Sequence, residues 1–317
     1  MFLWLAALWG ASYLFIKVGL EDGLEPVFIV FARTALAALF LVPLAAHLGA
    51  LKGVREHLGA LFVLGLIQVT GPFTLITVGE QEITSSLTGI LVAAAPIFTF
   101  LLAFVLEGEE RASPLSLLGV AIGIGGVALL LGVDAPGGSE ALVGGLLVVL
   151  ATTGYAVGAW FVKRKVPEVH PVGAVAMTCT ASALMTLPFA ILWLPDHFPA
   201  LDASASLLVL GVGGTGIAFV LFYSLVADIG PARTSLVAYV APGFSVIYGV
   251  TLLDEHFTVA TAAGLLLIIG GSWLAGSARS RQLPARGVDV PAASHPDCGA
   301  DAAALEGAAE RGDRVPV

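Results

Sequence analysis

The sequence predicts an all-α membrane protein whose ten transmembrane helices form two inverted five-helix repeats. Three observations carry this prediction: the composition, ten apolar runs of membrane-spanning length, and an internal repeat. Hydrophobic residues make up 58% of the 317 residues and charged residues 12%, whereas soluble domains carry about 25% charged residues. The mean hydropathy of +0.97 agrees, so the chain is expected to lie in a lipid bilayer.

Each of the ten apolar runs is long enough to cross a bilayer as one helix. A helix rises about 1.5 Å per residue and the hydrocarbon core is about 30 Å thick, so a crossing needs roughly 20 residues. The runs cover residues 2–20, 27–47, 59–78, 86–106, 114–133, 141–162, 172–194, 205–226, 233–253 and 258–276. The segments between the runs are too short to fold as separate soluble domains.

The fourth and ninth runs are near-copies of each other. Residues 86–109 read SLTGILVAAAPIFTFLLAFVLEGE and residues 232–255 read ARTSLVAYVAPGFSVIYGVTLLDE. A shift of 146 residues places Pro96 on Pro242. Further pairs follow the same shift, namely Thr88 and Thr234, Trp9 and Tyr155, Lys17 and Lys163, and Gly65 and Gly211. The chain therefore divides into one repeat at 1–133 and a second at 141–276.

An odd number of helices in each repeat sends the second copy into the membrane from the opposite side. Inverted repeats of this kind are typical of secondary transporters, whose substrate site lies near the midplane of the bilayer. The tail at 277–317 has no aromatic residue and is rich in Ala, Pro, Gly, Asp and Arg. This composition predicts a disordered cytoplasmic extension.

Lysine and arginine predict the orientation, because basic loops stay in the cytoplasm. The loops after the even-numbered runs and the tail are basic, while the loops after the odd-numbered runs carry acids and no Lys or Arg. Those acids include Glu21, Glu25, Glu80, Glu82 and Glu255. We therefore predict a multi-pass protein of the cytoplasmic membrane with both termini in the cytoplasm. Its net charge of −9 argues against nucleic acid as a partner.

An ordered set of motifs resembles a known transporter family. The segments are LWGASYLFIKVG at the start, FARTALAALFLVP, APIFTFLLAFVLEGEE followed by GVAIGIGG, and GPARTSLVAYVAPGFSVIYGVTLLDE followed by GLLLIIGG. Together they resemble the EamA family of the drug/metabolite transporter superfamily over residues 1 to about 276. The resemblance implies ten helices around a central cavity, alternating access, and in many members the export of metabolites or drugs.

Several residues are candidates for lining that cavity. Trp9 and Tyr13 fall near the middle of the first run, away from the interfaces where aromatic belts sit. The two repeated prolines kink their helices at mid-membrane; a packing kink without substrate contact is the alternative. The candidates are Trp9, Tyr13, Arg33, Pro96, Tyr155, Trp160, Tyr239, Pro242 and Ser245. The glycine spacings Gly119 to Gly123 and Gly154 to Gly158 predict close helix packing instead.

Two basic side chains lie inside helices, and each allows two interpretations. Lys17 lies about one turn from the outer end of its helix, where it can snorkel to the interface. Arg33 lies deeper, either paired with an outer-loop carboxylate such as Glu21, Glu25, Glu80 or Glu82, or forming a positive end of the cavity. If both cations served the cavity, an anion exchanger of the sugar-phosphate type would be the alternative function.

The sequence also argues against several classes of function. No catalytic pair lies at membrane depth, so we predict that the protein is not an enzyme. The two cysteines form no metal-binding spacing, and we expect neither metal nor cofactor. No acid or histidine lies in the central part of a run, so lipophilic cations are poor substrate candidates. We predict a secondary transporter that exports a neutral or zwitterionic, amino-acid-like metabolite.

Overall fold

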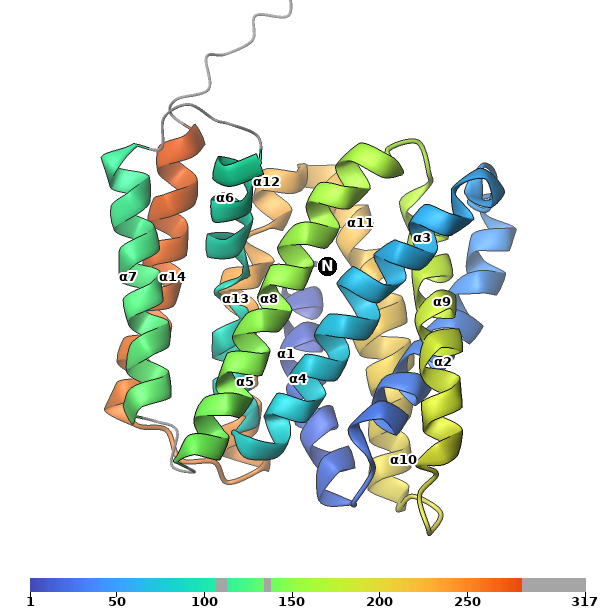
Figure 1. Cartoon of the computed structure of the whole chain (residues 1–317), viewed down its shortest axis with the longest axis horizontal. Helices are drawn as coiled ribbons and strands as arrows, with labels where there is room; N and C mark the ends of the chain where they lie inside the picture. Colours follow the sequence, from blue (N-terminus) through green and yellow to red (C-terminus); the bar gives the residue numbers. More distant parts are fainter. Residues whose placement is uncertain (107–112, 134–137, 281–317) are drawn as a thin grey trace, which may run out of the picture. The chain divides into compact units, whose positions relative to one another are not determined.

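The computed structural model describes residues 1–106, 113–133 and 138–280, and the regular elements in those residues are helices (Figure 1). The first half contains α1 (Phe2–Glu21), α2 (Pro26–His47), η1 (Val54–His57), α3 (Leu58–Leu64), η2 (Gly65–Thr70), α4 (Gly71–Glu82), α5 (Ser85–Val92), α6 (Ala95–Leu106) and α7 (Pro114–Val133). The second half contains α8 (Ser139–Lys165), α9 (Pro171–Leu192), α10 (Leu201–Leu208), η3 (Val209–Ile217), α11 (Ala218–Ile229), α12 (Pro231–Thr234), α13 (Val237–Leu252) and α14 (Val259–Ser280).

Nine helical segments among these described residues are long and apolar enough to cross a membrane. Of the ten predicted runs, 233–253 is the one that does not reach this length, because its helix α13 has 16 residues and follows the short α12. The third and eighth runs belong to longer helical segments, Val54–Glu82 and Leu201–Ile229. The prediction of an all-α membrane protein is confirmed. The disordered tail predicted at 277–317 begins too early, because residues 277–280 belong to α14, which ends at Ser280. The rest of the predicted tail lies outside the described residues.

Local sequence signals explain where the helices begin and end. Gly23, with a φ of 80°, turns the chain between α1 and α2, and Pro26 then takes the first position of α2, where a missing N–H costs nothing. Gly230, with a φ of 82°, separates α11 from α12 in the same way. The Thr84 side chain caps α5 by accepting a hydrogen bond of 3.2 Å from the Leu87 N–H.

The main packed helix pairs join the first half of the chain to the second. Helix α7 packs on α14, α2 on α9, α4 on α8, and α1 on α13. Figure 1 shows α7 beside α14 at the left edge and α2 beside α9 at the right. Neither half therefore buries its helices by itself, and residues 1–280 form one compact unit.

Glycines allow several of these pairs to approach backbone to backbone. A Cβ added to Gly119 of α7 would lie 2.7 Å from the Gly271 carbonyl of α14. A Cβ added to Gly79 of α4 would lie 2.5 Å from the Gly144 carbonyl of α8. Small residues serve membrane helices in this way because dispersion contacts replace the hydrophobic effect between them. The close packing predicted from Gly119 to Gly123, and from Gly154 to Gly158, is confirmed.

The two repeated proline helices differ in conformation. In the first half, Ala93 and Ala94 form a turn that separates α5 from α6, and Pro96 is the second residue of α6. In the second half, Pro242 lies inside the continuous helix α13. The expectation that Pro96 kinks a continuous helix is wrong for this state, because the helix is already interrupted two residues earlier.

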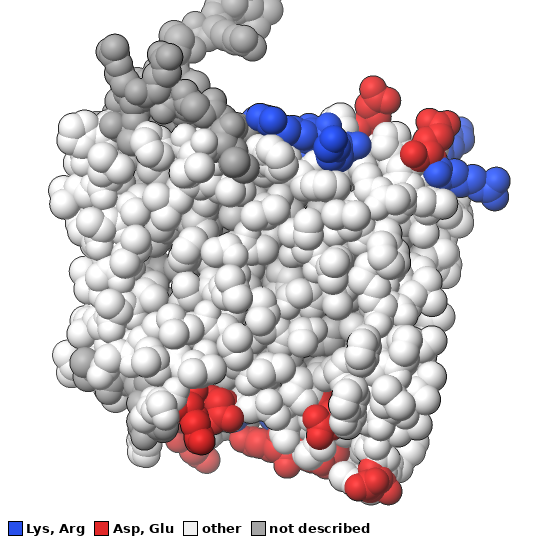
Figure 2. Space-filling view, in the orientation of Figure 1, with Lys and Arg blue, Asp and Glu red and all other residues white. Residues whose placement is uncertain are grey.

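Lys and Arg side chains gather at the upper end of the helices together with some acidic side chains, and the lower end is mainly acidic (Figure 2). We call the upper end the basic face; the elements that end there carry Lys52, Arg55, Lys163, Arg164, Lys165 and Arg233, and also the acids Glu56 and Glu168. We call the lower end the acidic face; it carries Glu21, Asp22, Glu25, Glu82, Glu140, Asp196, Asp202 and Asp254.

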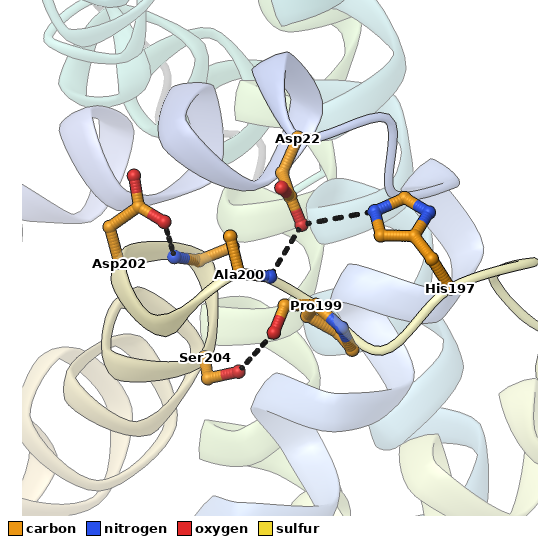
Figure 3. Close-up of polar contacts among 7 residues, drawn as sticks. Asp22, His197, Pro199, Ala200, Asp202 and Ser204 are labelled. Carbon is orange, nitrogen blue, oxygen red and sulfur yellow. Dashed lines mark hydrogen bonds and ion pairs between the residues drawn. The ribbon is translucent and has the colours of Figure 1, made fainter.

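A polar contact on the acidic face ties the first half to the second (Figure 3). The carboxylate of Asp22, which follows α1, accepts a hydrogen bond of 3.2 Å from the Ala200 N–H before α10. His197 Nε2 lies 3.7 Å from the same carboxylate. The contact fixes the end of α1 against the start of α10, the element that leads into the π-helical segment η3.

The sequence predicts that Glu80 lies in a loop of the acidic face, and this prediction is wrong. Helix α4 continues to Glu82, four residues beyond the predicted end of the third run. Gly79 lets this last turn pack closely against Gly144 of α8, and the Glu80 side chain is 0% exposed. Helix α4 extends beyond the apolar run, because close packing against α8 stabilises its last turn where the sequence is no longer apolar.

Candidate functional site

A cavity of about 280 Å³ lies among helices from both halves of the chain. Its walls come from α1, α2, η2, α4, α5, α6, α8, η3, α11 and α13. The described lining residues are Trp9, Ser12, Tyr13, Arg33, Gln68, Phe73, Ile76, Gly89, Val92, Ala93, Ala95, Tyr155, Gly214, Phe219, Phe222, Tyr223, Ala238, Ala241 and Pro242. Among these described lining residues, Arg33 is the one with a charged side chain, and the set contains no Asp or Glu.

The Arg33 guanidinium is held in place on one edge and one face. Its Nε donates a hydrogen bond of 2.8 Å to Thr215 Oγ1, and its Cζ lies 3.8 Å from the centre of the Phe73 ring. Thr215 in turn donates to the Leu210 carbonyl at 3.0 Å. Among the described residues, the two Nη groups of Arg33 have no hydrogen-bond acceptor and no carboxylate lies within 4.0 Å. The guanidinium is therefore oriented by protein contacts and keeps its two terminal donors for a ligand.

The predicted alternative for Arg33, an ion pair with an outer-loop carboxylate, is not present in the described residues. Glu80 is close enough to interact with Arg33 electrostatically, but its carboxylate oxygens form no hydrogen bond. The stacked Phe73 ring contributes a cation–π contact instead. Arg33 thus contributes a positive charge to one side of the cavity.

Aromatic rings of α1 and α11 form an uncharged part of the cavity wall, in contrast to the positively charged Arg33. The Trp9 and Phe222 ring centres are 5.4 Å apart, and Trp9 meets Phe219 edge to face at 6.4 Å. Tyr223 packs against both phenylalanines of α11, with centre distances of 5.2 Å to Phe222 and 6.3 Å to Phe219. Such rings offer an apolar surface and negative π faces to a ligand.

Two π-helical segments contribute to the site at positions that the repeat relates to each other. Segment η2 begins at Gly65 and supplies Gln68, while η3 contains Gly211 and supplies Gly214 and the Arg33 partner Thr215. A π-helix widens the turn and is often found at functional sites. The sequence predicts the Gly65 and Gly211 pairing but not the π-helical conformation.

The structure brings five of the nine predicted cavity residues together. Trp9, Tyr13, Arg33, Tyr155 and Pro242 line the cavity. The other four, Pro96, Trp160, Tyr239 and Ser245, are absent from its described lining.

Two of these four residues have clear structural roles. Ser245 of α13 is buried against Gly89 of α5, and its hydroxyl donates to the Pro242 carbonyl at 2.8 Å. Trp160 lies toward the basic face, with the Arg164 guanidinium 4.7 Å above its ring. Both therefore support packing or the membrane interface in this state rather than the cavity wall.

Sequence reasoning missed several lining residues, chiefly Ser12, Gln68, Phe73, Phe219 and Phe222. Gln68 carries a usable signal, because a polar amide in the apolar run 59–78 needs a partner or a cavity. The phenylalanines carry none, because a membrane helix presents phenylalanine to lipid, protein or cavity alike.

Lys17 does not line the cavity. Its ammonium donates to the Glu80 carbonyl at 3.0 Å and to the Ile83 carbonyl at 3.2 Å, at the end of α4. The last carbonyls of a helix lack intrahelical donors, so a cation is favoured there. Of the two cations predicted for an anion site, only Arg33 lines the cavity.

The arrangement suits binding rather than catalysis or metal coordination. Among the described residues, no group of three or more His, Cys, Asp or Glu side chains could hold a metal ion. A mostly apolar cavity with a few placed polar groups is typical of a small-molecule site. Arg33 can pair with a carboxylate through two parallel hydrogen bonds, while the aromatic surface accommodates an apolar group.

Comparisons with known proteins agree with this architecture. The chain is 26% identical over 272 residues to the uncharacterized transporter YoaV of Bacillus subtilis, covering 84% of this chain and 92% of that protein. It is 26% identical over 251 residues to the uncharacterized inner membrane transporter YedA of Escherichia coli K12, covering 78% of this chain and 80% of that protein.

A solved structure and a family profile complete the comparison. The solved structure, described as "Crystal structure of protein", has a TM-score of 0.59 and 23% identity, and the match covers 86% of this chain and 98% of that one. At this identity the likeness concerns the fold alone. The profile of the EamA-like transporter family matches residues 1–132 and 142–277. These matches span both halves of the chain, which is therefore a multi-pass membrane transporter and belongs to the EamA-like transporter family.

Proposed function

We propose that the chain is a secondary transporter that exports small neutral or zwitterionic, amino-acid-like metabolites across the cytoplasmic membrane by alternating access. The observation that supports this function is the cavity, where an oriented guanidinium with free Nη donors lies among aromatic rings. The proposal includes both termini in the cytoplasm, ten spans, inverted repeats at 1–133 and 141–276, and a cytoplasmic tail after α14.

The lining residues offer a binding partner for each part of an amino acid. The carboxylate pairs with the Arg33 Nη groups, and the apolar side chain packs on the Trp9 and Phe222 surface. The ammonium group meets aromatic faces and the Gln68 side-chain oxygen, which can stabilise a cation without a carboxylate. A lipophilic cation without a carboxylate would instead face the guanidinium, which repels it.

Counterflow in proteoliposomes tests this substrate class. L-leucine and L-phenylalanine should show saturable exchange, while tetraphenylphosphonium and phenethylamine, which lack a carboxylate, should not. The reason is that only the amino acids can pair with Arg33. Strong saturable transport of tetraphenylphosphonium together with no amino-acid exchange would refute the proposal.

The alternative of an anion exchanger of the sugar-phosphate type is less well supported. It would use Arg33 and Lys17 together, but Lys17 is bonded to the carbonyls of Glu80 and Ile83. A single guanidinium balances a monocarboxylate better than a phosphate with about two negative charges. Trans-stimulation by glucose 6-phosphate in the same proteoliposomes, without exchange of amino acids, would favour the alternative.

Alternating access is supported by the unlike conformations of the two proline helices. Because proline has no N–H, the carbonyls of Val92 and Ala238, four residues before Pro96 and Pro242, lack their helical donor. Both Val92 and Ala238 line the cavity. An inverted repeat whose copies differ in conformation leaves a central site open to one side, and exchange of the two conformations opens it to the other.

Replacing either proline by alanine should shift the facing equilibrium, in opposite directions for Pro96→Ala and Pro242→Ala. Alanine at either position supplies a backbone N–H that proline lacks, so it favours the conformation in which that segment is a continuous helix. A bias of about 1.4 kcal/mol changes the ratio of the two states about tenfold. The measurement is the accessibility, from each side of the membrane, of one reporter cysteine in a background without Cys179 and Cys298. If accessibility shifts in the same direction in both variants, or does not shift while transport is normal, the prolines serve packing and not the change of facing state.

A further inference from the structure

Glu80 is a buried acid that takes no part in the cavity wall. It is two positions before the last residue of α4 and 0% exposed, and both carboxylate oxygens lack a hydrogen-bond partner among the described residues. An ionised carboxylate is costly in such a place unless another charge or several donors meet it. A carboxyl group that holds a proton avoids this cost.

The nearest cation is already engaged by other acceptors. Lys17 Nζ donates to the backbone carbonyls of Glu80 and Ile83, and not to the Glu80 carboxylate. The charged or titratable groups that interact with Glu80 are Lys17 and Tyr13 on α1, Arg33 on α2, and Glu255 after α13. In the described parts of α8 and α5, which also pack on α4, no ionisable side chain interacts with it.

Glu255 interacts with Glu80 and is itself held by hydrogen bonds to α5. Its carboxylate accepts hydrogen bonds from the Ser85 N–H at 2.7 Å and the Ser86 N–H at 2.9 Å, and from the Ser86 hydroxyl. These bonds join the end of α13 to the start of α5. Together with the Lys17 bonds, they tie α1, α4, α5 and α13 into one cluster on the acidic side of the cavity.

This cluster lies one helical turn from the cavity on three separate helices. Tyr13, Ile76 and Gly89 line the cavity, and each is four positions from a cluster residue: Lys17, Glu80 and Ser85 respectively. Four residues of helix span about 6 Å. A change in charge at Glu80 therefore acts directly on the helices that form the cavity wall.

We propose that Glu80 is a proton-binding site, and that closing the acidic face takes up one proton there. The carboxylate accepts the proton from a hydronium ion and releases water as the face closes. When the face opens, water reaches Glu80, the proton returns to water, and the ionised carboxylate competes with the Glu80 and Ile83 carbonyls for Lys17. The proposal rests on the alternating-access part of the proposed function but requires no particular substrate.

Proton binding at Glu80 makes the equilibrium between the closed and open states depend on pH, and the direction of this dependence is defined. The closed state binds one proton more than the open state, so a fall in pH favours the closed state. The limit for a single proton is about a tenfold change in the closed-to-open ratio per pH unit. Glu80→Gln, which resembles the protonated acid but cannot titrate, should abolish this dependence.

Infrared spectroscopy of the full-length protein in nanodiscs tests the proton site without any substrate. The wild type should show the carbonyl band of a protonated carboxylic acid at pH 7, and Glu80→Gln should lose it. Glu82→Gln is the matched control, because Glu82 is exposed two residues later on the same helix. Glu80→Asp should shift the band to a different frequency. This second variant tests the assignment even if the glutamine variant does not fold. A band that survives Glu80→Gln, or its absence from the wild type, would overturn the site.

Cysteine accessibility tests the link to closure. A reporter introduced by Ala95→Cys lines the cavity, in a background with Cys179→Ala and Cys298→Ser. Labelling from the acidic face should slow as the pH falls in the wild-type and Glu82→Gln backgrounds, and should not change in Glu80→Gln. The same pH dependence in all three would overturn the link. A reporter that no condition makes accessible from the acidic face would contradict alternating access, and the infrared band would still decide the proton site.

Discussion

Replacing Arg33 by alanine should lower saturable amino-acid exchange about 10- to 100-fold while the protein still inserts and folds. A hydrogen-bonded pair with a charged group contributes about 1.5–3 kcal/mol, and about 1.4 kcal/mol corresponds to a factor of ten. The loss removes the oriented guanidinium that lies on Phe73 and donates to Thr215. Arg33→Lys should not restore exchange, because an ammonium cannot form the same two parallel bonds.

A charge-matched control separates this effect from a general loss of positive charge. Arg55 is exposed on the basic face in η1, an element that contributes no residue to the cavity, and Arg55→Ala should leave exchange within about twofold of wild type. Counterflow of L-phenylalanine, with size-exclusion profiles of each variant, provides the measurement. Normal exchange in a well-folded Arg33→Ala protein would remove Arg33 from the binding site.

Replacing Gly271 by valine should greatly reduce the amount of folded protein. A Cβ at this position would lie 2.5 Å from the Gly119 carbonyl oxygen and 2.5 Å from the Gly123 nitrogen, both backbone atoms of α7. Backbone cannot move aside as a side chain can, so α14 must separate from α7. Overpacking of this kind costs about 1–3 kcal/mol or more, which corresponds to a shift of about 5- to 150-fold in the folded-to-unfolded ratio.

The adjacent glycine provides a matched control. A Cβ at Gly270 meets no heavy atom within 4 Å, so Gly270→Val should remain near wild type in the same helix with the same change in helix propensity. The measurement is the fraction of monodisperse protein that survives a heating series, followed by size-exclusion chromatography. Equal stability of the two variants would show that the α7 and α14 contact is not close in the membrane.

Much of the fold follows from sequence because a bilayer imposes strong constraints. Backbone polar groups have no water to bond in the hydrocarbon core, so an apolar run of about 20 residues must be a helix. The run 114–133 is predicted and observed as α7 with the same bounds. The run 233–253 is less accurate, because Gly230 and the turn between α12 and α13 shorten the helix to Val237–Leu252.

The candidate site is only partly predictable for a related reason. Trp9 and Tyr13 can be singled out because amphipathic rings at mid-membrane need a polar or aqueous neighbour. Tyr239 and Trp160 are likewise polar-tipped aromatic residues of predicted membrane helices, but they lie outside the described cavity lining. Aromatic identity and depth select residues that avoid lipid, and they do not specify which neighbour a side chain meets.

The sequence by itself determined the class of this protein: its composition places it in a membrane, its apolar runs become helices, and its motifs identify the family. Only the tertiary structure decided which polar groups are paired. Glu80 reads as a loop acid and Lys17 as an interfacial cation, yet α4 continues past its apolar run, buries Glu80 and offers its last carbonyls to Lys17. The physical reason is that hydropathy depends on each residue alone, whereas the partner of a buried charge depends on helices far apart in the chain.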